Sequence, residues 1–199
     1  MKINFLAFSY FGLVLFIWLI QIALTYQTRF LYQFEDGGQY ATAVIWFVNH
    51  EISVISSTAF SLYALFHVIY RFFGFSLDTP HYFRIILHLF TLLSLGILLK
   101  RYFGYLKSII PLATIGLSPT FTYFVTYSAQ YGLELQLIPI CLVLVDSLDY
   151  EKKIKAAILE TGVWFIAMFG LISYAPFTFF LPALAIIMLI RGWWLFKKK

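Results

Sequence analysis

Two adjacent carboxylates, Glu35 and Asp36, are the residues in this sequence whose types and spacing most clearly suggest chemistry. They come soon after residues 3–28, a stretch that contains no charged side chain. A stretch of that length and apolarity predicts a helix that crosses a membrane. The sequence therefore predicts acid chemistry at a membrane surface, immediately outside an apolar anchor.

Three further polar residues are candidates because of their positions relative to apolar runs. His81 and Arg84 precede the run 85–99, and Glu134 lies about four residues inside a later run, or about 6 Å along a helix. A carboxylate costs about 2.5–3.5 kcal/mol at mid-bilayer and less near an interface, so Glu134 is expected to face a polar cavity. The histidines have no pair at i, i+4, and so no metal-type spacing. Cys141 is the single cysteine, which excludes an intrachain disulfide.

Composition assigns the chain to the membrane proteins. Hydrophobic residues make up 62% of it and charged residues only 12%, about half of the roughly 25% that soluble domains carry. The net charge of +5 could suit nucleic acid. Most Lys and Arg, however, occur in short clusters between apolar runs, where they set membrane topology. We therefore expect membrane lipid as a partner and no nucleic acid.

The chain is predicted to be an all-α, polytopic transmembrane helical bundle that forms a single domain over residues 1–199. Charge-free runs and proline-bounded turns define about six spans, at about 1.5 Å per residue across a core of about 30 Å. The predicted spans are 4–26, 85–99, 108–127, 131–148, 156–173 and 176–190. The last two should form a hairpin, because the residue before Pro176 is pushed out of helical geometry.

The segment between the first two spans, residues 27–83, is predicted to be an extracytoplasmic loop. Within it, residues 39–72 are interpreted as two interfacial helices, since a polar stripe of serines at helical spacing runs through the second half. Residues 52–70 are also long enough to span the membrane. The cluster positions of Lys and Arg fit six spans with the N-terminus inside and seven with it outside equally well. The serine stripe favours six, in a multi-pass protein of the plasma (inner) membrane.

The order in which polar residues alternate with the predicted spans along the chain is also informative. One span is followed by the acids of "FEDGGQYATAVIWFV", by surface helices, and by Arg84 at the entry to the second span. Later, Ser118-Pro119 ends one helix and Glu134 opens the next. In this order residues 5–190 resemble the N-terminal part of the multi-spanning GT-C glycosyltransferases. These use polyprenyl-phosphate sugars and include the protein O-mannosyltransferases and the lipid A aminoarabinose transferases.

The resemblance implies a GT-C transferase that moves a hexosyl or pentosyl group from a polyprenyl-phosphate donor to an acceptor, which the sequence does not identify, on the extracytoplasmic face. Asp36, flanked by Glu35, would be the catalytic base, or a ligand where a divalent metal is used. Arg84 would bind the donor phosphate through bidentate pairing. Glu134 and His81 would orient the acceptor, or Glu134 would hold Arg84 in place.

Two other classes stay open. One is a non-catalytic membrane subunit or assembly protein that has the same scaffold. The other is a transporter of a lipid-linked sugar, which should have polar residues deep in several spans. We expect the spans to be almost purely apolar at mid-depth, and this ranks transport last.

Overall fold

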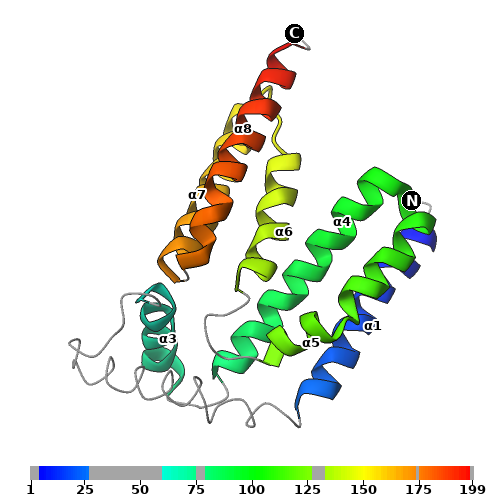
Figure 1. The fold of residues 1–199 in the computed structure, drawn as a ribbon, viewed down its shortest axis with the longest axis vertical. Helices are drawn as coiled ribbons and strands as arrows, with labels where there is room; N and C mark the ends of the chain where they lie inside the picture. The colour runs from blue at the N-terminus through cyan, green and yellow to red at the C-terminus, as the bar shows by residue number, and fades with distance from the viewer. Residues whose placement is uncertain (1–4, 27–59, 75–78, 127–132, 174, 198–199) are drawn as a thin grey trace.

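The computed structural model describes residues 5–26, 60–74, 79–126, 133–173 and 175–197, and in these ranges the chain is helical, with no strand. The α-helices in chain order are α1 (Phe5–Tyr26), α3 (Phe60–Phe73), α4 (Thr79–Gly116), α5 (Pro119–Thr126), α6 (Leu133–Asp146), α7 (Lys153–Ser173) and α8 (Phe180–Lys197) (Figure 1). The predicted all-α fold is thereby confirmed. Glu35, Asp36 and the predicted interfacial helix before residue 60 lie outside these ranges.

Gly104 divides α4 into two helical segments. Its φ of 75° and ψ of 172° are not helical, and a positive φ is readily adopted only by a residue without a Cβ. Tyr10 Oη donates a hydrogen bond of 3.1 Å to the Gly96 carbonyl before the kink, and the Tyr10 ring centroid lies 5.5 Å from that of Tyr105 after it. At the other end of α1, Gln21 donates to the carbonyl of Gly116. The chain therefore reverses at Gly104, between the two spans that were predicted on either side of it.

Small residues allow these helices to pack closely. A Cβ built on Gly116 would lie 2.8 Å from Ile17 Cγ2, and one built on Gly96 would lie 3.3 Å from Val14 Cγ2. Val14 and Ile17 are buried together with Leu92 and Leu112 in one apolar cluster. The contact between α1 and both segments of α4 thus depends on glycine at the points of closest approach.

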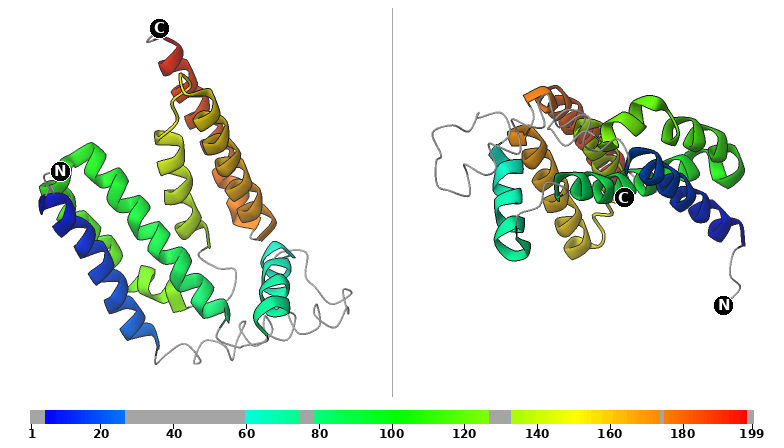
Figure 2. Two further views of the ribbon diagram at one scale, coloured as in Figure 1. Left: turned by 180° about the vertical axis from the view of Figure 1, so that it is seen from behind. Right: turned by 90° about the horizontal axis from the view of Figure 1, so that it is seen from below.

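Helices α6, α7 and α8 form a second group, and it contacts the first mainly through α4 and α6 (Figure 2). Thr91 of α4 donates to the Gln136 carbonyl near the start of α6, and Arg101 pairs with Asp146 at its end, so α6 runs parallel to the first segment of α4. A short 3-10 helix, Ala175–Phe179, connects α7 to α8, as expected for a hairpin that turns before Pro176. The core of this group is formed mainly by Leu133, Leu137, Val145, Val163, Ala167, Phe177 and Leu184.

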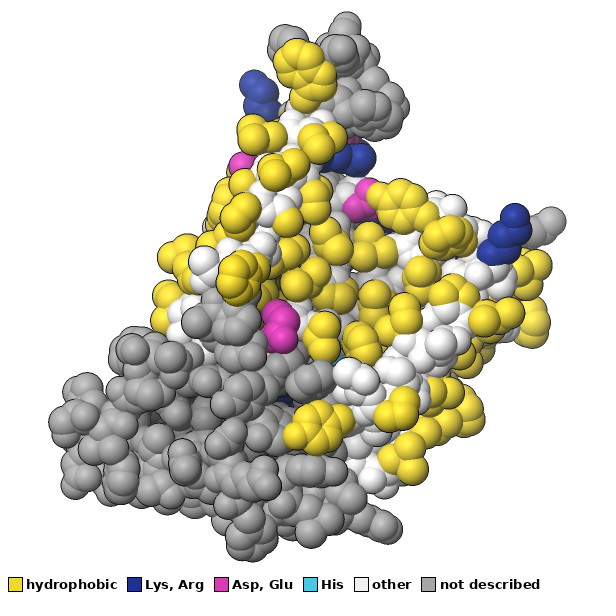
Figure 3. All heavy atoms as spheres, in the orientation of Figure 1, with side chains coloured by type: hydrophobic (Ala, Val, Ile, Leu, Met, Phe, Trp, Pro, Cys, Tyr) yellow, Lys and Arg dark blue, Asp and Glu magenta, His cyan; other side chains and the backbone are white. Residues whose placement is uncertain are grey.

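Three of the described helices are long and apolar enough to cross a membrane: Phe5–Tyr26, His81–Gly116, which includes the Gly104 kink, and Lys153–Ser173. The helix Phe177–Trp193 is apolar but shorter. Hydrophobic side chains cover much of the visible helix surface, which is the expected appearance of a surface in contact with lipid (Figure 3). Helix α3 confirms a helix within the predicted loop. It lies beyond the lower ends of α7 and α8 in Figure 1 and contacts α7.

Candidate functional site

A stripe of polar residues follows one face of the first segment of α4. His81, Arg84, His88, Thr91 and Ser94 are spaced by three or four positions, which places them above one another on a helix. All five are buried, and Arg84 is only 1% exposed. Polar groups inside an apolar bundle are costly unless they are hydrogen-bonded, so a stripe of this kind marks a candidate site.

Helix α1 contributes Gln21 to this stripe. Gln21 is fully buried, and its Oε1 lies 2.8 Å from His88 Nε2. Its Nε2 donates to the Gly116 carbonyl, which can only accept, so Oε1 must be the acceptor that faces His88. His88 Nε2 therefore carries a proton. Thr25, one turn further along α1, donates to the backbone carbonyl of Gln21 at 2.7 Å.

Helix α6 contributes Gln136 from the opposite side. Its Nε2 donates to the Arg84 carbonyl at 3.3 Å and lies 3.4 Å from His88 Nδ1. Because an amide NH₂ cannot accept, His88 Nδ1 must be the acceptor, which makes the ring a neutral Nε2–H tautomer. Thr91 Oγ1 donates to the backbone carbonyl of Gln136 at 2.9 Å. His88 is thus held between amides of two different helices.

Two acceptor oxygens near the start of α6 have no hydrogen-bond partner among the described residues. They are Glu134 Oε2 and Gln136 Oε1, and both atoms are buried. Glu134 lies in the first turn of α6, where the helix dipole favours a negative charge. An anionic oxygen and an amide oxygen are therefore available to a donor, such as a hydroxyl group, that reaches this end of the helix.

The structure brings three of the five predicted site residues to one end of the helices. His81 and Arg84 occupy the first two turns of α4, and Glu134 lies two positions before Gln136, which contacts the Arg84 carbonyl. The C-terminal end of α1 lies at this end as well. Gln21, which is five residues before the last residue of α1, Tyr26, contacts His88 and Gly116. Glu35 and Asp36 fall outside the described residues.

Sequence reasoning missed His88, Gln21, Gln136 and Thr91. The expectation that the spans are almost purely apolar at mid-depth is wrong for the second one, where His88, Thr91 and Ser94 are buried. The helical spacing of residues 81, 84, 88 and 91 was a signal that could have found the stripe. No local pattern indicates that Gln21 and Gln136 meet it, since they come from other helices.

The chemistry of this cluster is that of anion and hydroxyl recognition. The guanidinium of Arg84 keeps its charge at any physiological pH and offers donors in a geometry that matches phosphate oxygens. Burial strengthens its attraction to an anion, because the local dielectric constant is low. Among the described residues no group of three His, Cys, Asp or Glu could hold a metal ion, and Cys141 is buried and free.

The identity of the site therefore depends on this geometry and on the chemistry of its side chains. A buried cation and a neutral imidazole lie on α4 and two acceptor oxygens lie on α6, and contacts of Gln136 and Gln21 join these helices to each other and to α1. No protein-family model, curated protein or solved structure matches this chain.

Proposed function

We propose that this chain is an integral membrane glycosyltransferase, or the N-terminal part of one, that transfers a sugar from a polyprenyl-phosphate donor to an acceptor on the extracytoplasmic face. The observation that carries the proposal is the meeting of buried Arg84 with the start of α6, through the contact of Gln136 with the Arg84 carbonyl. A cation suited to phosphate and a carboxylate, Glu134, belong to the same end of the helices. The proposed transfer uses both, the cation at the leaving phosphate and the carboxylate at the acceptor.

The proposed reaction assigns one step to each residue. The acceptor hydroxyl attacks the anomeric carbon, and its proton passes to Asp36 as the new carbon–oxygen bond forms. The bond from that carbon to the polyprenyl phosphate breaks, and the phosphate leaves with the electron pair. Arg84 stabilises the negative charge that develops on the phosphate. Glu134 and His81 orient the acceptor.

The proposed topology has six spans, in a multi-pass protein of the plasma membrane. The reversal at Gly104 supports it, because this reversal makes two passes of α4. Charge supports it as well. Lys100, Arg101 and Lys107 surround that reversal, and Arg101 also contacts Asp146 at the end of α6. On the positive-inside rule this end faces the cytoplasm and the end of Arg84 faces outward.

A specific observation also favours transport as a second candidate. The buried polar stripe extends from His81 to Ser94, or about 20 Å along α4, which is more than half of the hydrocarbon thickness. Transport proteins place polar groups at that depth, where a substrate must pass. A transporter would move the lipid-linked sugar without breaking its bond to phosphate.

Binding and turnover of a polyprenyl-phosphate sugar by the purified protein test the proposal. In detergent or nanodiscs we expect saturable binding of decaprenyl phosphate, and with the sugar-linked donor we expect release of free polyprenyl phosphate. Arg84→Gln should weaken donor binding by about tenfold or more, as expected for the loss of a charge-assisted hydrogen bond. Arg84→Lys, which keeps the charge, should retain part of the binding.

Arg71→Gln is the matched control, because Arg71 is exposed on α3 and the change removes the same charge. Helix content and elution volume show whether each variant folds. Equal losses in Arg71→Gln and Arg84→Gln would mean a non-specific charge effect and would contradict the proposal. Binding that depends on Arg84, with movement of intact donor across vesicles and no release of polyprenyl phosphate, would favour transport.

A further inference from the structure

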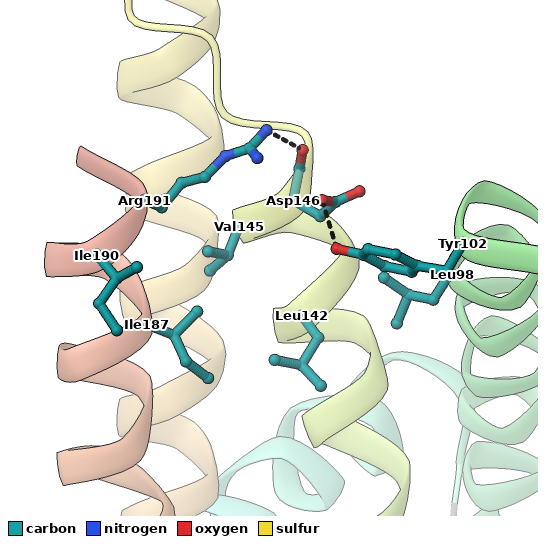
Figure 4. A pocket seen from close by; sticks show the side chains of 8 residues that line it. All are labelled: Leu98, Tyr102, Leu142, Val145, Asp146, Ile187, Ile190 and Arg191. Atoms are coloured by element: carbon teal, nitrogen blue, oxygen red, sulfur yellow. Dashed lines mark hydrogen bonds between the residues drawn. The ribbon is translucent and has the colours of Figure 1, made fainter. Parts of the chain in front are cut away.

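A second feature, at the end of the first segment of α4 that lies opposite Arg84, is a groove between α4 and α8. Its volume is about 440 Å³, which is within the range of ligand sites in proteins, roughly 300–1,000 Å³. Leu98 comes from α4, Leu142 from α6, and Ile187 and Ile190 from α8. Figure 4 shows these aliphatic side chains below a set of polar ones.

The polar side chains gather at one end of the groove. Asp146 accepts a hydrogen bond of 3.1 Å from Tyr102 Oη, and Arg191 Nη2 donates at 2.9 Å to the Asp146 carbonyl (Figure 4). Arg101, which does not line the groove, pairs with the Asp146 carboxylate. These groups carry two positive charges and one negative charge. Arg101 offsets the charge of the Asp146 carboxylate, so the charge of Arg191 remains as the excess at this end of the groove.

We propose that this groove binds an acyl chain of an anionic phospholipid, whose phosphate is held by Arg191. The aliphatic part and the cationic end follow one another in the order in which a phospholipid presents its chain and its headgroup. Basic pockets between membrane helices at their cytoplasmic side are suited to anionic lipid headgroups. The proposal requires membrane insertion but is independent of the glycosyltransferase chemistry at Arg84.

The residues of the groove argue against a transmembrane helix as the occupant. Helix–helix contacts in membranes are enriched in Gly, Ala, Ser and Thr, which let the backbones approach closely. The apolar lining consists of Leu98, Leu142, Val145, Ile187 and Ile190, all of them bulky and branched. Such side chains leave a channel suited to a flexible chain of methylene groups.

The test measures lipid binding to the full chain by native mass spectrometry and by titration in detergent. The probes are dioleoyl phosphatidylglycerol, which is anionic, and dioleoyl phosphatidylcholine, which has the same chains and no net charge. We expect one molecule of phosphatidylglycerol to bind about fivefold more tightly than phosphatidylcholine. Arg191→Gln should remove most of this preference, and Arg191→Lys should keep it. Leu142→Trp, which fills the groove, should weaken the binding of both lipids.

Lys155→Gln provides the matched control, because it removes one charge from exposed Lys155 of α7, which does not line the groove. Its lipid preference should equal that of the unchanged protein. Equal binding of the two lipids, or the same loss in Lys155→Gln as in Arg191→Gln, would overturn the proposal. So would a dimer in the same spectra that Leu142→Trp converts to monomer, since a second copy of the chain would then occupy the groove.

Discussion

Gln21 of α1 and His88 of α4 meet inside the bundle, with Oε1 and Nε2 2.8 Å apart. Both side chains are buried, and each has a further partner: Gln21 donates to the Gly116 carbonyl, and His88 Nδ1 faces Gln136 Nε2. This contact ties α1 to both segments of α4 and, through Gln136, to α6. It also fixes the tautomer of the imidazole that lies one turn beyond Arg84 on α4.

Replacement of Gln21 by Leu should therefore destabilise the protein although it makes the interior more apolar. The change removes a donor and an acceptor and leaves His88 Nε2–H and the Gly116 carbonyl without these partners, each at a cost of about 1–3 kcal/mol. We expect a clear drop in the midpoint of thermal unfolding, followed by circular dichroism in detergent. The double variant Gln21→Leu/His88→Leu should lose less than the two single variants together. Additive losses would contradict the inferred contact.

Gly116→Ala tests the close approach of α1 and α4. The new Cβ would lie 2.8 Å from Ile17 Cγ2, and such overpacking typically costs about 1–3 kcal/mol. Ile17→Ala in the same chain should restore part of the loss by removing the clashing atom. Gly12→Ala is the control, because a Cβ there has no atom within 4 Å, and it should leave the unfolding midpoint unchanged or slightly raised. Similar effects at Gly12 and Gly116 would refute the packing argument.

Glu134→Gln should separate function from stability. Glu134 Oε2 is buried and has no hydrogen-bond partner among the described residues, so loss of the charge relieves a desolvation cost while it removes a favourable helix-dipole interaction of about 0.3–1 kcal/mol. The unfolding midpoint should change little. Under the proposed function, release of polyprenyl phosphate should fall about 10-fold or more, as expected for a lost hydrogen bond to a charged group. Glu160→Gln, which removes the same charge from α7, should keep full activity.

Tyr70 of α3 should make the stability of the protein sensitive to alkaline pH. Burial raises the pKa of Tyr70 from 10.0 to about 12, and the hydrogen bond with Thr79 partly opposes the shift. Because the unfolded chain ionises this phenol first, the stabilisation is fully present below about pH 10 and is lost as pH rises towards 12. Tyr70→Phe should reduce the dependence of the unfolding midpoint on pH over that window, relative to the unchanged protein. Tyr82→Phe, at an exposed tyrosine of α4, should not.

Much of the architecture was predictable because its causes are local. The uncharged stretch before Arg29 must satisfy its backbone groups internally if it lies in a membrane, so a helix was the expected structure for α1. The cluster of Lys100, Arg101 and Lys107 marked the interruption that the structure has at Gly104. Arg84 and Glu134 were recognisable because a charge beside or within an apolar run is costly.

The sequence by itself determined the class of the protein and the local order of its helices, since apolar length, charge clusters and prolines act over a few residues. Tertiary structure alone decided which buried groups meet. Gln21 contacts His88, Gln136 contacts the Arg84 carbonyl, and Arg191 contacts the Asp146 carbonyl, each between helices that are distant in sequence. Such pairings depend on the rotation and register of each helix against its neighbours. Packing at Gly96, Gly116 and Gly170 contributes to that register, because a Cβ at each of these positions would lie within 3.3 Å of a side chain from another element.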